Sequence, residues 1–420
     1  MLKWIYLDFN SYFASVEQQL NPELRGKPIA VVPMIADNTS VIAASYEAKA
    51  FGIKTGTLVS EAKKMCPGLI LVNSGHGPYI DFHHKIIEVV DEVMPVDRVC
   101  SIDELAFELK GSQKDRANAI RLAQQLKDVI HQKVGEVIHC SIGIAPNRWI
   151  AKIAADMQKP NGLTIIEKSE LPHRLKILKL RDLPGIGFAM EERLRKHMVF
   201  SMGDLLALDE KEFRQVWGNI HGVNVYRWLR GEETEEVATR TRSISHSHVL
   251  PPEDRNWKSA LDVIKKLTHK AAVRLRREGY WTARLSIDVS LLPPPGERKA
   301  QDFRSVWGRS AGARYFDQSV KLMETQDTRE LISALNELWK SHPEDAQPLK
   351  VGMVLSDLTE DAQHTPSLFE DPRRALMPRL LDEINQKFGK DKVYFGAIHD
   401  VRDSARTLIA FTRIPKADEF

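Results

Sequence analysis

The sequence predicts a multidomain α+β protein, and three observations support this fold class. The chain has 420 residues, more than one ordinary hydrophobic core organises, so two to four domains are expected. Its hydrophobic content of 43% and charged content of 28% are typical of a soluble globular protein. Strand and helix patterns alternate along the chain without a glycine-rich phosphate loop, which favours α+β sheets over a Rossmann or P-loop fold.

The first part of the chain, to about residue 165, alternates strands with helices. The apolar run 3–8 predicts a buried strand, and Asn10 or Ser11 can cap the helix that follows it. Further strands are expected at 27–32, at 40–45, as a pair around 99–109, and at 137–145. Further helices are expected at 46–52 (closed by Gly52), at 79–94 (stopped by Pro95), at 114–134, and at 147–162 (capped by Asn147).

The second part of the chain changes character twice. Residues 166–232 carry a wholly helical pattern, and the polar segment 233–242, which switches from acidic to basic, predicts a linker. A second α+β unit is expected over 243–405, followed by a loose tail at 406–420. Within this unit, strands are expected at 243–250, 283–291, 350–357 and 393–399, and helices at 257–278, 328–340 and 373–388.

Charge and cysteine usage narrow the function classes. The net charge is only +3, but residues 240–284 hold eleven Lys or Arg against four acids. This excess indicates either a surface for a polyanion or a solvated helix face. Three widely spaced cysteines have neither disulfide nor zinc spacing, and we expect no secretory signal and no membrane span, hence a cytoplasmic protein. His246 and His248 alternate on one predicted strand, where we expect surface residues.

Three acids fall at the ends of predicted strands. Asp8 ends the run 3–8, and Asp103 and Glu104 stand side by side in the pair around 99–109. Neighbouring strands of one sheet would bring these carboxylates together, where they repel one another unless cations lie between them. Mg²⁺ bound by carboxylates and substrate phosphates is the usual cation at such sites. Acids at strand ends are more often simply solvated, so spacing alone leaves both interpretations open.

Five segments in one order resemble the Y-family translesion DNA polymerases, the DinB and UmuC group. They are LDFNSYFASVEQ, SYEAKAFGIKTG, SIDE, AKIAADMQKPNG and LPGIG, and the likeness covers nearly the whole chain. The resemblance implies an error-prone, template-directed DNA polymerase that adds deoxynucleotides to a primer 3′-hydroxyl during damage tolerance. It also implies a right-hand fold with four parts: a palm (1–20 and 77–165), small fingers (21–76), a helical thumb with a helix-hairpin-helix (166–232), and a little finger (243–405).

The resemblance implies roles for residues around the three acids. Two Mg²⁺ ions would be held by Asp8, the Phe9 carbonyl, Asp103 and Glu104. The incoming triphosphate would be held by Ser11, Tyr12, Tyr46, Lys49 and Lys159. Phe13 matches the steric gate that collides with a ribose 2′-hydroxyl, although a helical Phe is otherwise most often plain core. The chain departs from the family at Lys49, often Arg, at Ala43, often a hydroxyl residue, and at Asn10, often an acid. Phosphate binding is then either weaker or supplied partly from elsewhere.

DNA and protein partners follow from the same resemblance. Backbone phosphates would meet Gly185 and Gly187 of LPGIG and, in the little finger, Arg240, Arg242, Ser243 and Ser245. The segment TPSLFEDP (365–372) resembles the peptide that docks on the sliding clamp, with Leu368 and Phe369 as its apolar pair and Thr365 in place of the usual glutamine. A loop pinned by two apolar side chains is the alternative. The resemblance leaves open accessory subunits of the UmuD and RecA kind, as in an SOS response.

Two other function classes use parts of the same pattern. A non-catalytic DNA-binding scaffold of this fold would not need all three acids. A metal-dependent nuclease would need the acids but not Phe13 or the triphosphate contacts. Primer extension and pyrophosphate release distinguish a polymerase from both.

Overall fold

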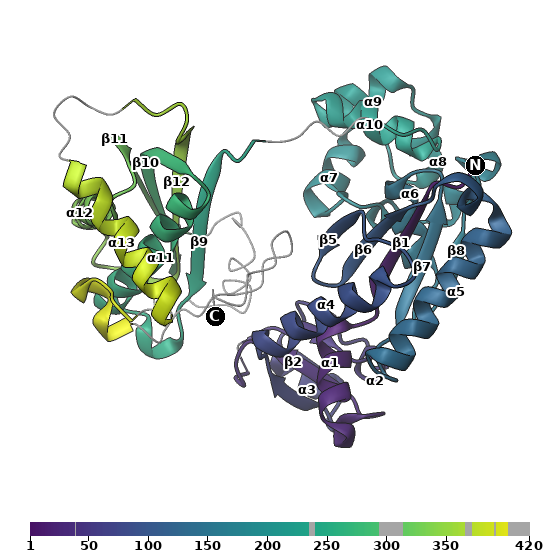
Figure 1. Ribbon diagram of the computed structural model, residues 1–420, viewed down its shortest axis with the longest axis horizontal. Coiled ribbons are helices and arrows are strands. Elements are labelled where there is room, and N and C mark those ends of the chain that lie inside the picture. Colours follow the sequence, from purple (N-terminus) through teal and green to yellow (C-terminus); the bar gives the residue numbers. More distant parts are fainter. Residues whose placement is uncertain (38, 235–239, 294–313, 366–371, 390–391, 402–420) are drawn as a thin grey trace. The chain divides into compact units, whose positions relative to one another are not determined.

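The computed structural model describes residues 1–420 apart from 38, 235–239, 294–313, 366–371, 390–391 and 402–420. The chain divides into two compact units. The N-terminal unit holds the elements up to α10 (Ile220–Leu229), and the C-terminal unit holds those from β9 (Ser243–Val249) onward (Figure 1). The α+β multidomain prediction is therefore confirmed.

A five-stranded sheet is the centre of the N-terminal unit. Its strands, in spatial order, are β5 (Arg98–Ser101), β6 (Glu104–Glu108), β1 (Trp4–Phe9), β7 (Cys140–Ala145) and β8 (Leu163–Ile165). The central strand β1 pairs antiparallel with both β6 and β7, whereas β8 runs parallel to β7. Four of these strands match sequence expectations; β8, only three residues long, was not predicted.

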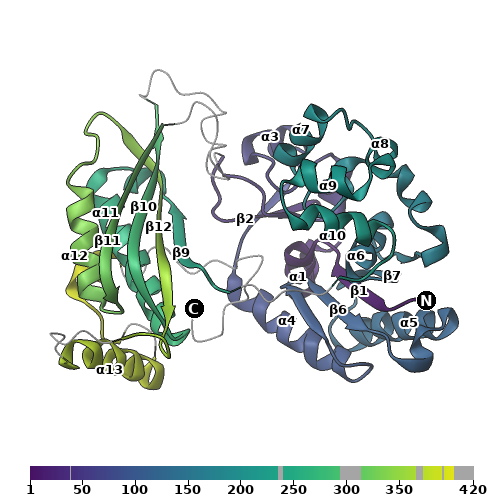
Figure 2. The ribbon, with the colours of Figure 1, turned by 90° about the horizontal axis from the view of Figure 1, so that it is seen from above.

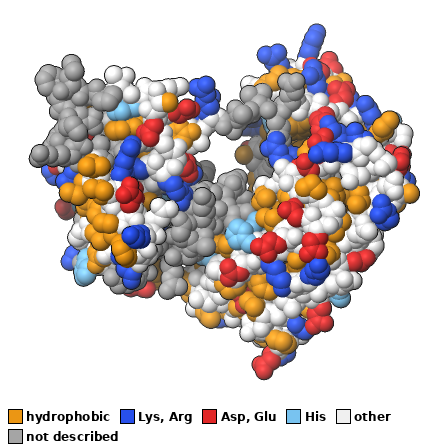
Figure 3. Space-filling model, viewed as in Figure 1, with side chains coloured by type: hydrophobic (Ala, Val, Ile, Leu, Met, Phe, Trp, Pro, Cys, Tyr) orange, Lys and Arg blue, Asp and Glu red, His pale blue; other side chains and the backbone are white. Residues whose placement is uncertain are grey.

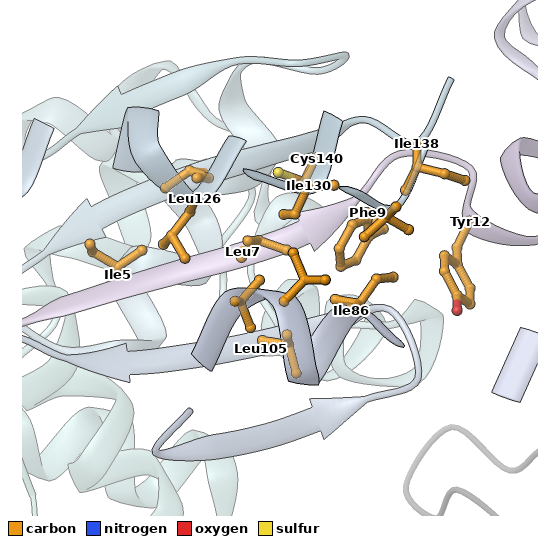
Figure 4. Close-up of a cluster of buried hydrophobic side chains, with 14 of the residues drawn as sticks. Ile5, Leu7, Phe9, Tyr12, Ile86, Leu105, Leu126, Ile130, Ile138 and Cys140 are labelled. Atoms are coloured by element: carbon orange, nitrogen blue, oxygen red, sulfur yellow. The ribbon is translucent and has the colours of Figure 1, made fainter. Parts of the chain in front are cut away.

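Every residue of β1 is buried because both faces of the sheet are covered. The odd-numbered residues Ile5, Leu7 and Phe9 pack with side chains of α4 (His76–Asp91) and α5 (Arg116–Lys133), as Figure 4 shows. The even-numbered residues Trp4 and Tyr6 pack on the other face in the core built around α6 (Arg148–Met157). Since side chains alternate along a strand, Asp8 lies on the α6 face of the sheet.

A smaller layer follows α1 (Tyr12–Leu20). Its three-stranded sheet has the order β3 (Ala43–Ala44), β2 (Ile29–Val32) and β4 (Ile70–Asn73). Two helices accompany it, α2 (Tyr46–Ala50) and α3 (Val59–Met65). The sequence predicts β2, β3 and α2 but not α3 or β4. The side chains of β4 are mostly half-buried and give little alternation.

The range 166–232, fully described, contains only helices as regular elements, as predicted. These are α7 (Phe188–Lys196), α8 (Met202–Ala207), α9 (Glu210–Trp217) and α10, with three short 3₁₀ segments before them. Their buried residues, among them Leu194, Leu205 and Phe213, join the same core as α6. This helical layer is therefore fastened to the α6 face of the five-stranded sheet.

The C-terminal unit is a four-stranded antiparallel sheet with helices on one face (Figure 2). The strand order is β11 (Arg314–Thr325), β10 (Tyr280–Leu292), β12 (Gln347–Glu360) and β9. The helices are α11 (Trp257–Arg277), α12 (Thr328–Trp339) and α13 (Pro372–Phe388). The sequence predicts all of these except β11, whose side chains are largely exposed.

Two expectations for this unit are wrong. Residues 393–399 were expected as a strand, but Gly396–Val401 is a 3₁₀ helix. Phe395 and Ile398 are three residues apart, the spacing that places two side chains on one side of a 3₁₀ turn, and Ile398 is buried. His246 and His248 were expected at the surface, but both are partly buried, because they share a strand face with the core residue Ile244.

Two surface properties complete the description. None of the described helices is both long and apolar enough to cross a membrane. Over the face of the N-terminal unit in Figure 3, basic and acidic side chains are interspersed. Local clusters of charge are therefore more informative than the net charge.

Candidate functional site

The three acids predicted from the sequence meet at one end of the five-stranded sheet, and we call them the acid trio. Asp8 and Glu104 are directly opposite each other on the paired strands β1 and β6. Asp103 occupies the turn between β5 and β6, and its carbonyl accepts the Phe9 N–H at 2.9 Å. Strand register therefore brings residues 95 positions apart in the chain to one site.

Two lysines supply positive charge to the acid trio. Lys159 Nζ donates to Asp8 Oδ1 at 2.7 Å and lies 2.8 Å from Asp156. Lys152, on α6, forms an ion pair with Glu104, whose other oxygen accepts the Tyr6 hydroxyl at 2.8 Å. These contacts follow from the position of Asp8 and Tyr6 on the α6 face of β1.

Burial changes the protonation of the acid trio. It raises the pKa of Asp8 to about 7, despite the opposing effect of Lys159. Burial and the neighbouring Glu104 also raise the pKa of Asp103, against the hydrogen bond from the Ser101 hydroxyl at 2.5 Å. Burial opposes ionisation of Glu104 as well, but Lys152 and Tyr6 outweigh it and lower the pKa of Glu104. Additional positive charge would therefore favour the ionised forms of Asp8 and Asp103.

The donors suit a hard cation. Carboxylate oxygens and a backbone carbonyl are the ligands that Mg²⁺ prefers. Among the described residues, no three His, Cys, Asp or Glu side chains converge as a ready metal site, and Asp8 and Glu104 each contact a lysine. The acid trio thus has the chemistry for a divalent ion, and the lysines provide its charge balance here.

Helix α1 begins beside Asp8. Its N-cap, Ser11, has φ +50° and makes no side-chain capping hydrogen bond. The Ser11 Oγ is buried and has no partner within the described part of the chain. A helix N-terminus directs free backbone N–H groups outward and attracts anions. The arrangement therefore suits an anionic ligand.

Phe13 is partly buried and stacks on Tyr79 of α4, with ring centroids 4.2 Å apart and planes 9° apart. Tyr12 is buried, and its hydroxyl donates to the Tyr79 carbonyl at 2.6 Å. Phe13 thus packs against the core on one side and remains accessible on the other. That position is compatible with both interpretations of the ring given by the sequence.

We call three residues beside the acid trio the cationic cluster, because two of them carry ammonium groups: Tyr46, Lys49 and Lys159. The Lys49 ammonium lies over the Tyr46 ring, 4.4 Å from its centroid. Although the residue as a whole is exposed, desolvation of this ammonium and repulsion by Lys159 lower the pKa of Lys49. An anion between the two lysines would relieve that repulsion.

The residues predicted to meet DNA are exposed in their separate units. Gly185 has φ +88°, where a side chain would be strained, and Gly187 is the N-cap of α7. In the C-terminal unit, Ser243 and Ser245 lie on the face of β9 opposite Ile244, after the exposed Arg240 and Arg242. Leu368 and Phe369 lie outside the described residues.

Sequence reasoning missed Lys152 and Tyr6. Tyr6 has the pattern of core in a buried strand, and Lys152 that of a solvated helix residue. The available signal was the spacing of Lys152 and Asp156, four residues apart on one face of α6, with Lys159 in the turn that follows the helix.

Comparisons with known proteins identify the family of this chain. The model described as the impB/mucB/samB family matches residues 7–156, and the model of its C-terminal domain matches 241–368. The DNA polymerase IV of Moorella thermoacetica is 30% identical over 92% of this chain and 94% of its own. DNA polymerase IV 1 of Halalkalibacterium halodurans is 31% identical over 93% and 92%.

Solved structures of Y-family DNA polymerases share the fold of this chain. A Y-family DNA polymerase chimera is 25% identical, with a TM-score of 0.68 over 86% of this chain and all of that one. An insertion ternary complex of Dbh DNA polymerase is 25% identical, with a TM-score of 0.54 over 85% and 98%. The chain therefore belongs to the impB/mucB/samB family, as a DinB-type Y-family enzyme, and is a lesion-bypass DNA polymerase with the palm, fingers, thumb and little finger of that fold.

Proposed function

We propose that this polymerase is Mg²⁺-dependent and uses two ions held by the acid trio and the Phe9 carbonyl. The observation that supports this is the pairing of Asp8 opposite Glu104, with Asp103 beside them and two of the three carboxyl pKa values raised by burial. Bound Mg²⁺ would lower the pKa of the primer 3′-hydroxyl and neutralise the triphosphate. The acids would then hold the ions, and Lys152 and Lys159 would exchange their contacts with Glu104 and Asp8 for other partners.

The chain's own residues would bind and select the nucleotide. The cationic cluster, the Ser11 and Tyr12 positions and the N-terminus of α1 would hold the triphosphate of the incoming deoxynucleotide. Phe13 would exclude a ribose 2′-hydroxyl. Lys49 in place of an arginine offers a point charge without a two-pronged hydrogen-bonding fork, so Lys159 would carry a larger share of phosphate binding.

Other segments would hold the primer and template. The exposed turn at Gly185 and Gly187 would receive a backbone phosphate in the thumb, 166–232. Arg240, Arg242, Ser243 and Ser245 would do so at the start of the little finger, 243–405. The fingers would span 21–76 and the palm 1–20 with 77–165. Contacts of this kind position DNA without reading its sequence, which suits an enzyme that copies any template.

The purified chain, a primer-template, deoxynucleotides and Mg²⁺ provide the decisive experiment. Primer extension with release of pyrophosphate is expected, and extension should continue past a damaged template base. Shortening of the primer without pyrophosphate would indicate a nuclease. DNA binding without either reaction would indicate a scaffold. Omitting Mg²⁺, and adding Ca²⁺ in its place, tests whether extension depends on Mg²⁺.

The wider role is also a proposal. The chain would work in the cytoplasm, where its free cysteines stay reduced, as an error-prone enzyme of an SOS-type response that raises mutation rates. It would dock on the sliding clamp through Leu368 and Phe369. Extension by the chain alone, compared with extension after adding UmuD- or RecA-type subunits, tests whether partners are needed.

A further inference from the structure

The turn 158–162, which follows α6 and carries Lys159, is tied to β1 and β7 by buried polar groups. Asn10, only 2% exposed, accepts the Asn161 N–H through Oδ1 at 2.7 Å. Its Nδ2 donates to the Ser141 hydroxyl at 3.0 Å. The same hydroxyl, fully buried, accepts the Gly162 N–H at 3.2 Å. One amide and one hydroxyl thus bind two successive N–H groups of the turn.

A third group holds the turn from outside. Lys127, on α5, donates from Nζ to the Asn161 carbonyl at 2.5 Å and to its side-chain oxygen at 3.0 Å. Asn161 has φ +54°, a left-handed conformation that is uncommon outside glycine. The turn is also tight, because a Cβ at Gly162 would lie 1.8 Å from the Gln158 carbonyl. These hydrogen bonds therefore maintain a backbone shape that the turn would not keep alone.

The anchoring of this turn fixes the backbone position from which the Lys159 side chain extends. Asn10 is two residues after Asp8, and its own N–H donates to the His139 carbonyl at 2.9 Å. The segment that carries Asp8 therefore also fixes the turn that carries Lys159, whose ammonium reaches Asp8 at 2.7 Å. A lysine side chain is long and flexible, so its phosphate-binding position depends on a fixed backbone origin.

An amide at position 10 suits this role. Asn10 accepts from one neighbour and donates to another, which an apolar side chain cannot do. An acid could still accept from Asn161 but would add a negative charge beside the buried Asp8. We infer that Asn10, through Ser141 and the Asn161 turn and with Lys127, is a positioning residue that sets Lys159 for nucleotide binding. This inference rests on the proposed phosphate-binding role of Lys159.

A double-mutant cycle tests the inference through KM and kcat for a deoxynucleotide. Asn10→Ala should raise KM about fivefold to tenfold, the effect of losing one or two buried hydrogen bonds, and change kcat less. In the Lys159→Ala background, Asn10→Ala should raise KM no further, because its effect acts through that lysine. Asn10→Asp, which keeps the acceptor for Asn161, should stay within about threefold of the wild-type KM.

Lys127→Met provides a variant that leaves the interior intact. It should raise KM and be non-additive with Lys159→Ala, whereas Lys133→Met, the same change on the same helix but paired with Glu92, should leave KM unchanged. If Lys159→Ala itself leaves KM unchanged, the phosphate-binding proposal fails. If Lys159→Ala raises KM but the effects of Asn10→Ala and Lys127→Met simply add to it, the positioning inference fails while the proposed function stands.

Discussion

At the scale of single residues, the acid trio allows a direct test. Asp103→Ala should lower the rate of nucleotide addition by far more than about tenfold, because tenfold corresponds to only ~1.4 kcal/mol, too little for a lost metal ligand. DNA affinity should survive, since the proposed DNA contacts are made by other residues, in the thumb and little finger. Glu108→Ala, at the other end of β6, is the matched control and should retain activity. Single-turnover extension measures the rate of nucleotide addition, and a binding assay measures DNA affinity. Near-normal extension by Asp103→Ala would contradict the assignment of Asp103 as a metal ligand.

Phe13 supports a second prediction at this scale. Phe13→Ala should raise ribonucleotide incorporation relative to deoxynucleotide incorporation by at least about tenfold, or ~1.4 kcal/mol, since a ring is removed and no charge changes. Single-nucleotide kinetics with matched ribo- and deoxynucleotides measure the ratio. Because Phe13 also stacks on Tyr79, some loss of thermal stability is expected. An unchanged ratio together with a lower melting temperature would assign Phe13 to the core alone.

Sequence and structure agree on some residues for a physical reason. The acids Asp8, Asp103 and Glu104 interrupt apolar strand patterns, and such interruptions are visible without coordinates. Their partners are not, because Lys152 becomes a neighbour of Glu104 only once α6 packs on the even-numbered face of β1. Charge balance at the site is therefore a property of packing between elements.

At the scale of elements, burial determines how much could be predicted. Strands β1 and β7 are buried throughout. Helix α6 has a buried apolar face, and Asn147 caps its N-terminus. The sequence patterns of these three elements are therefore clear. The missed strands β4, β8 and β11 are half-buried or exposed, which leaves no clear alternation. The incorrect strand at 393–399 combined aromatic and apolar residues whose burial depends on α11, a contact distant in sequence.

The packing of β9 on α11 predicts a dependence on pH. Burial, with Lys270 and Lys266 nearby, lowers the pKa of His248 to about 4. Between pH 6.5 and pH 4, His248 is therefore neutral in the folded protein. In the unfolded chain the same side chain has its ordinary pKa of about 6.5, so it binds a proton over this range. Stability attributable to His248 is full above pH 6.5 and is lost as the pH falls towards 4, by at most ~1.4 kcal/mol per pH unit.

Hydrogen exchange of the β9 and α11 amides between pH 7 and pH 4.5, corrected for intrinsic rates, measures this loss. His248→Gln should flatten the dependence, because glutamine does not titrate. His173→Gln, at an exposed position in the N-terminal unit, should leave it unchanged. An equally steep decline in His248→Gln would assign the pH dependence to other groups.

At the scale of the whole molecule, DNA affinity should depend steeply on salt and hardly on sequence. Each phosphate neutralised contributes about 0.7 to 0.9 to the slope of log K against log salt. Arg240→Gln with Arg242→Gln should therefore lower that slope by about 1.4 to 1.8 if both side chains meet phosphates. Lys340→Gln, which removes the same kind of charge from the end of α12, is the control. An unchanged slope in the double variant would exclude both arginines from the interface.

The sliding clamp is the partner that the sequence predicts for the segment containing Leu368 and Phe369. Described groups bracket this segment in the C-terminal unit. Before it, His364 stacks on Trp281 at 3.6 Å and contacts Glu324 at 2.6 Å; after it, α13 is tied to α11 by the Arg276–Asp382 ion pair at 2.6 Å. Both flanks are thus attached to the folded unit, so a docked clamp would act on the whole little finger.

If Leu368 and Phe369 insert into a clamp pocket, burying both contributes roughly 3–6 kcal/mol before ordering costs, and the missing glutamine leaves the affinity modest. Leu368→Ala with Phe369→Ala should then lower clamp binding and processivity while thermal stability and distributive synthesis stay near wild type. Leu376→Ala with Leu380→Ala, two exposed leucines of α13, is the matched loss of apolar surface and should leave clamp binding intact. If the first pair lowers the melting temperature by several degrees and the wild-type chain binds no clamp, these residues are a structural anchor, because side chains buried within the unit stabilise it and cannot also reach a partner.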